Sequence, residues 1–130
     1  MNRNKKLLIF VVEDNLIYQQ LIAKQLDSLT YAIQFFTQGE ECINALKITL
    51  PDVIVLDNGL AGTMSGLETL KVIRSLHPDL YVVLFSTDKA LDTLENYLNY
   101  GSFVYLEKNI TAFARLKDKV LSSEVFSSKV

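Results

Sequence analysis

Three short apolar runs end in charged side chains, and this repeated pattern most constrains the fold. The runs are LLIFVVED (7–14), DVIVLD (52–57) and FVYLEK (103–108). A continuous apolar run is typical of a strand buried between two layers of helices. Because the carboxyl ends of parallel strands meet at one edge of a sheet, we expect the charged groups to meet in one cleft. Those groups are Glu13, Asp14, Asp57 and Lys108, which together indicate a divalent cation and a phosphoryl group.

Length and composition favour one globular domain. The chain has 130 residues, enough to bury roughly two-thirds of its unfolded surface. Its 49% hydrophobic and 22% charged residues are ordinary for a soluble protein. The net charge is −2 and the basic residues are spread along the chain, so direct nucleic-acid binding has no support. The single cysteine, Cys42, fits a reducing cytosol and is expected to be a small buried hydrophobic residue on a helix.

The N-terminus carries a basic stretch followed by an apolar one, but it does not match a targeting signal. Only six apolar residues precede Glu13, whereas a signal peptide has an apolar region of ~7–15 residues. No small-residue cleavage site follows, and no apolar stretch is long enough to span a bilayer. We therefore expect a cytoplasmic chain with no membrane partner.

Strand-like and helix-like patterns alternate along the chain. Strands are expected within residues 7–14, 33–36, 53–56, 81–85 and 103–106, and helices within 16–28, 39–49, 67–76, 91–98 and 113–120. The first helix carries an apolar stripe that includes Ile17, Leu21 and Ile22. Either Asp14 or Asn15 is expected to cap its start.

Five strands alternating with five helices predict a doubly wound α/β fold, in which helices cover both faces of a five-stranded parallel sheet. With right-handed crossovers, the strand order 2-1-3-4-5 places the first and third strands on either side of the switch point. Those two strands carry the three acids. We expect one domain over residues 1–121, followed at 122–130 by a polar tail or the start of a linker.

The order and spacing of several motifs resemble the receiver domain of two-component response regulators, the family of the bacterial chemotaxis regulator. The matching elements are VVEDN at the first strand, PDVIVLD at the third, Gly66-Leu67 at the third helix, VVLFST at the fourth strand, and Gly101 with residues 105–108 at the fifth. The resemblance covers almost the whole chain. It implies a flavodoxin-like fold and a signalling function.

The resemblance implies a role for each residue of the expected cleft. Asp57 would be the phosphoacceptor, whose carboxylate attacks a phosphoryl group and forms an acyl phosphate. Mg²⁺ is the implied cofactor, with Glu13, Asp14, Asp57 and the backbone carbonyl of Gly59 as its ligands. Lys108 would contact the phosphate as a point charge.

Ser86 and Tyr105 are implied to form a switch. Ser86 would donate its hydroxyl to a phosphate oxygen, and Tyr105 would turn into the space that Ser86 vacates. The predicted output is a repacked surface around the fourth helix, the fifth strand and the fifth helix. Two departures leave alternatives open, because Thr87 competes with Ser86, and Asn109 follows Lys108 where the family usually has a proline after a cis bond.

The implied function is a switch rather than an enzyme, with self-phosphorylation and autodephosphorylation at Asp57 as its only reactions. A sensor histidine kinase or a phosphotransfer protein would be the phosphoryl donor. Other expected partners are an unknown downstream effector or fused output domain, and a second copy in a phosphorylation-dependent homodimer. The alternative is a degenerate receiver that serves as a constitutive interaction module, independent of phosphorylation.

Other functions on the same fold fit the residues less well. A flavodoxin needs a Ser/Thr/Gly-rich loop after the first strand, where Glu13-Asp14-Asn15 stands instead. A phosphatase of the aspartyl-phosphate type would carry a second aspartate two residues after the nucleophile, and Gly59 is there. The glycine-lysine motif of P-loop NTPases is absent.

Overall fold

The computed structural model describes residues 6–26, 30–57, 59–60, 62, 64–86, 104–108, 114–116 and 118–119. Its strands and helices are β1 (Leu7–Val12), α1 (Leu16–Gln25), β2 (Tyr31–Phe36), α2 (Gly39–Leu46), β3 (Val53–Asp57), α3 (Gly66–Leu76), β4 (Tyr81–Ser86) and β5 (Val104–Glu107). Residues 114–116 and 118–119 are also helical. The helix expected at 91–98 and the tail expected at 122–130 lie outside the described residues.

The five strands form one parallel sheet in the order β2-β1-β3-β4-β5, which confirms the predicted fold and strand order. At the carboxyl edge of the sheet, Val12 of β1 pairs with Leu56 of β3. Asp57 of β3 pairs with Phe85 of β4. The ends of these three central strands therefore lie beside one another, as a cleft at the switch point requires.

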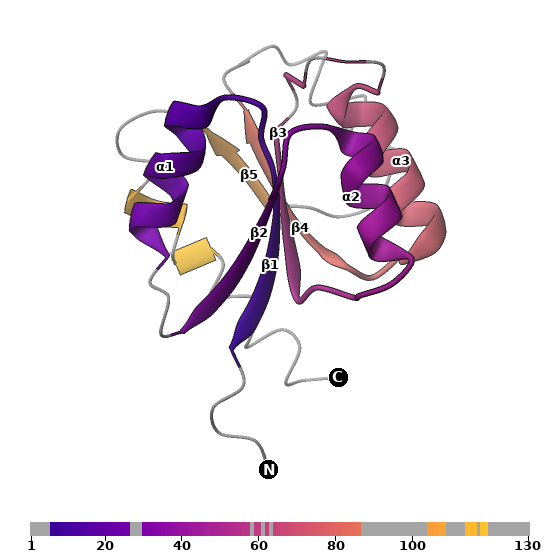
Figure 1. Cartoon of the computed structure of the whole chain (residues 1–130), viewed down its shortest axis with the longest axis horizontal. Coiled ribbons are helices and arrows are strands. Elements are labelled where there is room, and N and C mark those ends of the chain that lie inside the picture. Colours follow the sequence, from indigo (N-terminus) through magenta and orange to yellow (C-terminus); the bar gives the residue numbers. More distant parts are fainter. Residues whose placement is uncertain are drawn as a thin grey trace.

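Helices cover both faces of the sheet. Figure 1 shows α1 on one face and α2 with α3 on the other. Successive residues of β3 alternate between the two faces, since Val53 and Val55 belong to the hydrophobic cluster under α1, whereas Ile54 and Leu56 belong to the cluster under α2 and α3. Each such fully buried aliphatic side chain contributes about 1.5–3 kcal/mol to folding.

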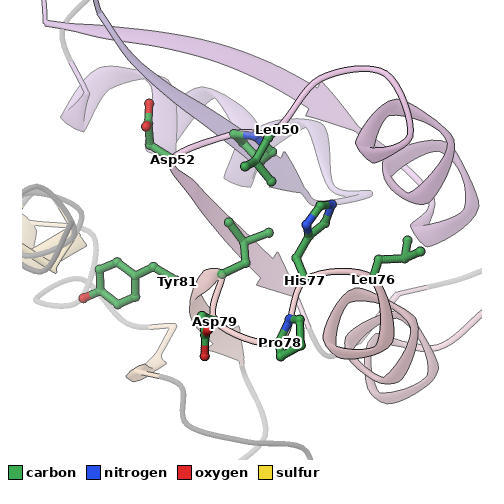
Figure 2. A pocket seen from close by; sticks show the side chains of 9 residues that line it. Leu50, Asp52, Leu76, His77, Pro78, Asp79 and Tyr81 are labelled. Atoms are coloured by element: carbon green, nitrogen blue, oxygen red, sulfur yellow. The ribbon is translucent and has the colours of Figure 1, made fainter. Parts of the chain in front are cut away.

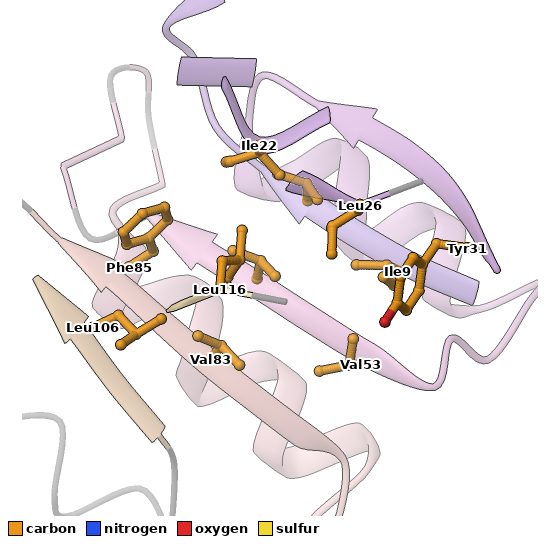
Figure 3. Packing of buried hydrophobic residues seen from close by; sticks show 11 residues of the cluster. Ile9, Ile22, Leu26, Tyr31, Val53, Val83, Phe85, Leu106 and Leu116 are labelled. Carbon is orange, nitrogen blue, oxygen red and sulfur yellow. The ribbon is translucent and has the colours of Figure 1, made fainter. Parts of the chain in front are cut away.

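The cluster under α1 joins elements from both halves of the chain (Figure 3). Ile22 of α1 and Leu26, the C-cap residue of that helix, pack there with Phe85 of β4, and Leu116 brings in the helical residues near the C-terminus. Leu116 is fully buried, as expected for the inner face of the last helix. Tyr18 of α1 packs against the same cluster at its margin.

Only part of the predicted apolar stripe of α1 is buried. Ile22 and Leu26 are 0% and 2% exposed, whereas Ile17 and Leu21 are 67% and 37% exposed. Tyr18, Ile22 and Leu26 follow one another at intervals of four, so they share the side of the helix that faces the sheet. Ile17 and Leu21 lie one residue further round the helix and remain at the surface, where the apolar pattern alone predicted a continuous stripe.

The ends of the helices on the other face are held by short-range contacts. Ser65 and Glu68 form a capping box at the start of α3, with the Ser65 hydroxyl accepting from the Glu68 amide at 3.1 Å. Gly39 begins α2 directly against Thr69 of α3, and a Cβ at position 39 would overlap the Thr69 hydroxyl.

Among the described residues, no helix combines the length and apolarity needed to cross a bilayer.

Candidate functional site

The structure brings together the three acids that the sequence predicted for one cleft. Glu13 and Asp14 follow β1, and Asp57 ends β3. One carboxylate oxygen from each of the three lies within 4.8 Å of the others. Glu13 is 1% exposed and Asp57 5% exposed, while Asp14 is half-buried. Parallel pairing of β1 with β3 produces this arrangement, because it aligns the carboxyl ends of the two strands.

Lys108 reaches into the same cleft from the end of β5. Its Nζ lies 3.2 Å from Oδ1 of Asp57 and forms an ion pair with Oε1 of Glu13. The Lys108 side chain is 3% exposed. A buried ammonium requires carboxylate partners, and here it has two, Glu13 after β1 and Asp57 at the end of β3.

The backbone around Glu13 is held by the first turn of α1. Asn15, and not Asp14, is the N-cap, since its Oδ1 accepts from the amides of Ile17 at 2.9 Å and Tyr18 at 3.1 Å. The Asn15 amide donates to Oε2 of Glu13 at 3.1 Å. The Gln19 side-chain amide donates to the Glu13 carbonyl at 2.7 Å. The sequence had left the cap open between Asp14 and Asn15.

The loop after β3 also contacts the predicted phosphoacceptor. The Gly59 amide donates to Oδ1 of Asp57 at 3.0 Å. A Cβ built at position 59 would lie 3.6 Å from the same oxygen, so the loop runs close beside the carboxylate. The metal-ligand role of the Gly59 carbonyl stays a prediction.

The described residues of the site include more acids than basic groups. The pKa of Glu13 is raised from 4.5 to about 7, chiefly because the carboxyl group is buried; the contact with Lys108 opposes this shift, and the charge of Asp57 adds to it. With every carboxyl group ionised, three acids face one ammonium within the described part of the cleft. A bound cation would offset the remaining charge.

The donor set fits Mg²⁺. Carboxylate oxygens are the hard ligands that this ion prefers, and it often keeps several water ligands beside one or two carboxylates. Magnesium–oxygen distances of about 2.0–2.1 Å put opposite ligands about 4.2 Å apart, so oxygens within 4.8 Å of one another need only small side-chain movements to share one ion.

The two predicted switch residues are described in their backbones alone. Ser86 ends β4 and pairs with Glu107, and Tyr105 of β5 pairs with Leu84. Ser86 therefore stands one residue beyond Phe85, the strand partner of Asp57. The side chains of Ser86 and Tyr105, and all of Thr87 and Asn109, lie outside the described residues. The choice between Ser86 and Thr87 stays open, as does the geometry of the Lys108–Asn109 bond.

Sequence reasoning missed two residues that contact the site, Tyr18 and Gln19. The Tyr18 ring centroid lies 4.3 Å from Nζ of Lys108, and Gln19 binds the Glu13 carbonyl as described above. They are the third and fourth residues of α1. Their positions in the first turn of a helix that starts at the cleft could have suggested such contacts.

A separate cavity of about 380 Å³ lies near the amino ends of β3 and β4. Its lining includes Leu50, Asp52, His77, Asp79 and Tyr81. Figure 2 shows the His77 ring directed toward Leu50, while the Asp79 carboxylate points away. The described lining includes none of the predicted site residues.

Two curated relatives are similar to this chain over most of its length. The chain is 31% identical over 123 residues to a protein-glutamate methylesterase/protein-glutamine glutaminase of Clostridium acetobutylicum, covering 90% of this chain and 35% of that protein. It is 30% identical over 115 residues to the DNA-binding transcriptional regulator NtrC of Klebsiella pneumoniae, covering 87% and 24% respectively. The chain thus spans only about a third or less of the length of these relatives.

Solved structures share the fold over nearly the whole chain. The phosphorylated cyanobacterial phytochrome response regulator RcpA is 25% identical, with a TM-score of 0.77 over 94% of both chains. The receiver domain of the sensor histidine kinase PA1611 from Pseudomonas aeruginosa PAO1 was solved with a magnesium ion coordinated in its active-site cleft. It is 23% identical, with a TM-score of 0.79 over 91% of this chain and 97% of that one.

The family model of the response regulator receiver domain matches residues 9–121, a span that includes the three acids and Lys108. Together with the strand order, this match confirms the resemblance in the motifs. The chain belongs to the response regulator receiver domain family of two-component signalling.

Proposed function

We propose that this chain accepts a phosphoryl group on Asp57, in a Mg²⁺-dependent reaction, from a sensor histidine kinase or a phosphotransfer protein. The observation that carries the proposal is the buried cluster at the carboxyl edge of the sheet. There Asp57 lies within reach of Glu13 and Asp14 and is paired with Lys108.

The reaction is a displacement at phosphorus. A carboxylate oxygen of Asp57 forms a bond to the phosphorus atom, while the bond to the donor atom breaks and the donor keeps the electron pair. The donor is a histidine nitrogen in a kinase, or the acetate oxygen in acetyl phosphate. Asp57 is anionic, so cations must offset its repulsion from the phosphoryl oxygens. Lys108 is one such cation and is already 3.2 Å from Asp57.

Glu13, Asp14 and Asp57 would hold the Mg²⁺, with the carbonyl of Gly59 as the expected fourth protein ligand. When bound, the ion would reduce the negative charge that the phosphoryl oxygens present to Asp57. The Gly59 amide, which donates to Oδ1 of Asp57, would orient the attacking carboxylate.

The output would follow from a change at the same edge of the sheet. Ser86 would bind the phosphoryl group and Tyr105 would turn inward, so that the surface near β5 repacks. That surface would bind an effector, a fused output domain or a second copy of the chain. The relatives that carry a methylesterase/glutaminase or a DNA-binding regulator in a longer protein support an output of this fused kind.

The cluster argues against the degenerate alternative. A receiver that never binds Mg²⁺ or phosphate has no need for three buried or half-buried acids around one lysine, and burying unbalanced charge costs stability. RcpA, the 25% identical relative solved in its phosphorylated form, also supports the phospho-accepting function.

The test is the intact mass of the protein after incubation with acetyl phosphate, with and without Mg²⁺. We expect a gain of one phosphoryl group that requires the ion and is absent from Asp57→Asn. Asp52→Asn is the matched control, because Asp52 precedes the same strand at its other end and should leave the gain intact. A folded wild type that gains nothing, or an Asp57→Asn variant that still gains the group, would refute the proposal.

A further inference from the structure

Lys108 is flanked by aromatic rings as well as by carboxylates. Its Nζ lies 4.3 Å from the ring centroid of Tyr18 and 5.8 Å from that of Phe85. An ammonium within about 6 Å of a ring centroid is attracted by the negative face of the ring, and the attraction grows when the pair is removed from water. The Tyr18 contact is the shorter of the two and comes from α1, a different element from the strands that supply the carboxylates.

The position of Tyr18 is determined by packing. The side chain is half-buried and lies against the hydrophobic cluster that contains Ile22, Phe85 and Leu116. Its own amide donates to the Asn15 cap, so the start of α1 is anchored next to Asp14. The ring therefore contributes to the burial of the Lys108 side chain, which is only 3% exposed.

A lysine needs such support in this place. Its ammonium is a compact charge on a flexible four-carbon chain, and fixing that chain costs conformational entropy. A third carboxylate would hold it, but would also compete with the phosphoryl group for the positive charge. An aromatic face attracts the ammonium while carrying no net charge, so the charge stays available to an incoming anion.

We propose that Tyr18 is a positioning residue for Lys108, whose ring holds the ammonium beside Asp57 and thereby sets how fast Asp57 is phosphorylated. The inference rests on the proposed function. It assigns the effect to the ring and not to the phenol hydroxyl of Tyr18, which lies outside the motifs that resemble the receiver family.

Two substitutions separate the ring from the hydroxyl. Tyr18→Phe keeps the ring, whereas Tyr18→Leu keeps an apolar side chain without it. We expect phosphorylation by acetyl phosphate to be within about twofold of wild type in Tyr18→Phe and to fall about tenfold in Tyr18→Leu, as loss of a desolvated cation–π contact implies. Ile17→Ala is the matched control, because Ile17 neighbours Tyr18 but is 67% exposed and should leave the rate unchanged.

The second readout does not depend on phosphorylation. Protons of the Lys108 side chain near an aromatic face are shifted upfield in the NMR spectrum, so the ε-methylene signal should be upfield in wild type and Tyr18→Phe and should move toward the ordinary lysine position in Tyr18→Leu. Lys108→Arg identifies the signal by its disappearance. Melting temperatures verify that each variant is folded, and Tyr18→Met replaces Tyr18→Leu if the latter is not.

Equal rates in wild type and Tyr18→Leu, or an equal loss in Tyr18→Phe and Tyr18→Leu, would overturn the proposal. An ε-methylene chemical shift of Lys108 that is the same in wild type and Tyr18→Leu would also overturn it. If the wild type gains no phosphoryl group, the proposed function fails, and the NMR comparison then decides by itself whether Tyr18 holds Lys108.

Discussion

Asp52 and Asp57 stand at opposite ends of β3, and each accepts a hydrogen bond from a backbone amide, but only Asp57 faces a buried cation. Oδ2 of Asp52 accepts from the Leu8 amide at 2.7 Å, at the amino end of the sheet. Oδ1 of Asp57 accepts from the Gly59 amide and lies 3.2 Å from Nζ of Lys108. Two aspartates five residues apart in the chain therefore have different roles. Asp52 joins β1 to the start of β3, while Asp57 belongs to the site.

Replacement of Asp52 should affect stability and leave phosphorylation intact. Asp52→Ala leaves the Leu8 amide without its side-chain acceptor, and we expect the free energy of unfolding to fall by about 1–3 kcal/mol. Urea denaturation measures this loss, with Asp52→Asn as the control that keeps an oxygen at the same place. An Asp52→Ala variant as stable as wild type would show that this hydrogen bond contributes little.

Replacement of Lys108 by methionine should affect both stability and phosphorylation. Without the ammonium, the carboxylates of Glu13 and Asp57 remain buried together and unpaired. We expect the free energy of unfolding to fall by about 3 kcal/mol in the absence of Mg²⁺, and phosphorylation to become slower than in any Tyr18 variant.

The effect of Mg²⁺ on stability tests whether Lys108 and the ion neutralise the same carboxylates. Because the ion supplies the missing positive charge, it should raise the melting temperature of Lys108→Met by more than that of wild type. Na⁺ at matched ionic strength controls for general screening. Equal shifts in the two proteins would mean that Lys108 and the ion do not share the same carboxylates.

Replacement of Gly39 by alanine should strain the contact between α2 and α3. The added Cβ would overlap the Thr69 hydroxyl and lie 3.1 Å from the Thr69 Cβ. We expect a loss of about 1–3 kcal/mol in the free energy of unfolding, although alanine is ordinarily the better helix residue. The double variant with Thr69→Ala, which removes the overlapping hydroxyl, should recover part of the loss. Additive effects in the pair would contradict the proposed overlap.

The Cys42 thiol should be unreactive in the folded protein. Burial raises its pKa to about 12, so almost no thiolate exists at pH 8. Iodoacetamide should therefore modify Cys42 slowly in the native state and quickly in denaturant. The folded-state pKa lies above the unfolded value of about 8.5, so this thiol contributes stability below that pH and loses it as the pH rises toward 12. Wild type should lose more stability than Cys42→Ala between pH 8 and 10.5, and parallel curves would exclude the effect.

The apolar runs alone were enough to predict the sheet, because strands buried on both faces need continuous hydrophobic sequence. Right-handed crossovers left few strand orders, and 2-1-3-4-5 is the one that places the first and third strands on either side of the switch point. The meeting of Glu13, Asp14 and Asp57 followed from parallel pairing, which brings the carboxyl ends of the strands to one edge. The sequence was less informative about α1. Ile17 and Ile22 are the same residue type. The rotation of the helix about its axis, set by packing against the sheet, buries Ile22 and exposes Ile17.

By itself, then, the sequence determined the fold class and the charged residues at the ends of the strands, because these depend on patterns within single strands and helices. Only the tertiary structure decided how those residues are paired. The ion pair of Lys108 with both Glu13 and Asp57, the choice of Asn15 as cap, and the contact of Tyr18 with Lys108 all depend on the relative positions of segments. The physical reason is that such contacts depend on distances of a few ångströms between elements, and these are set by the packing of the whole core.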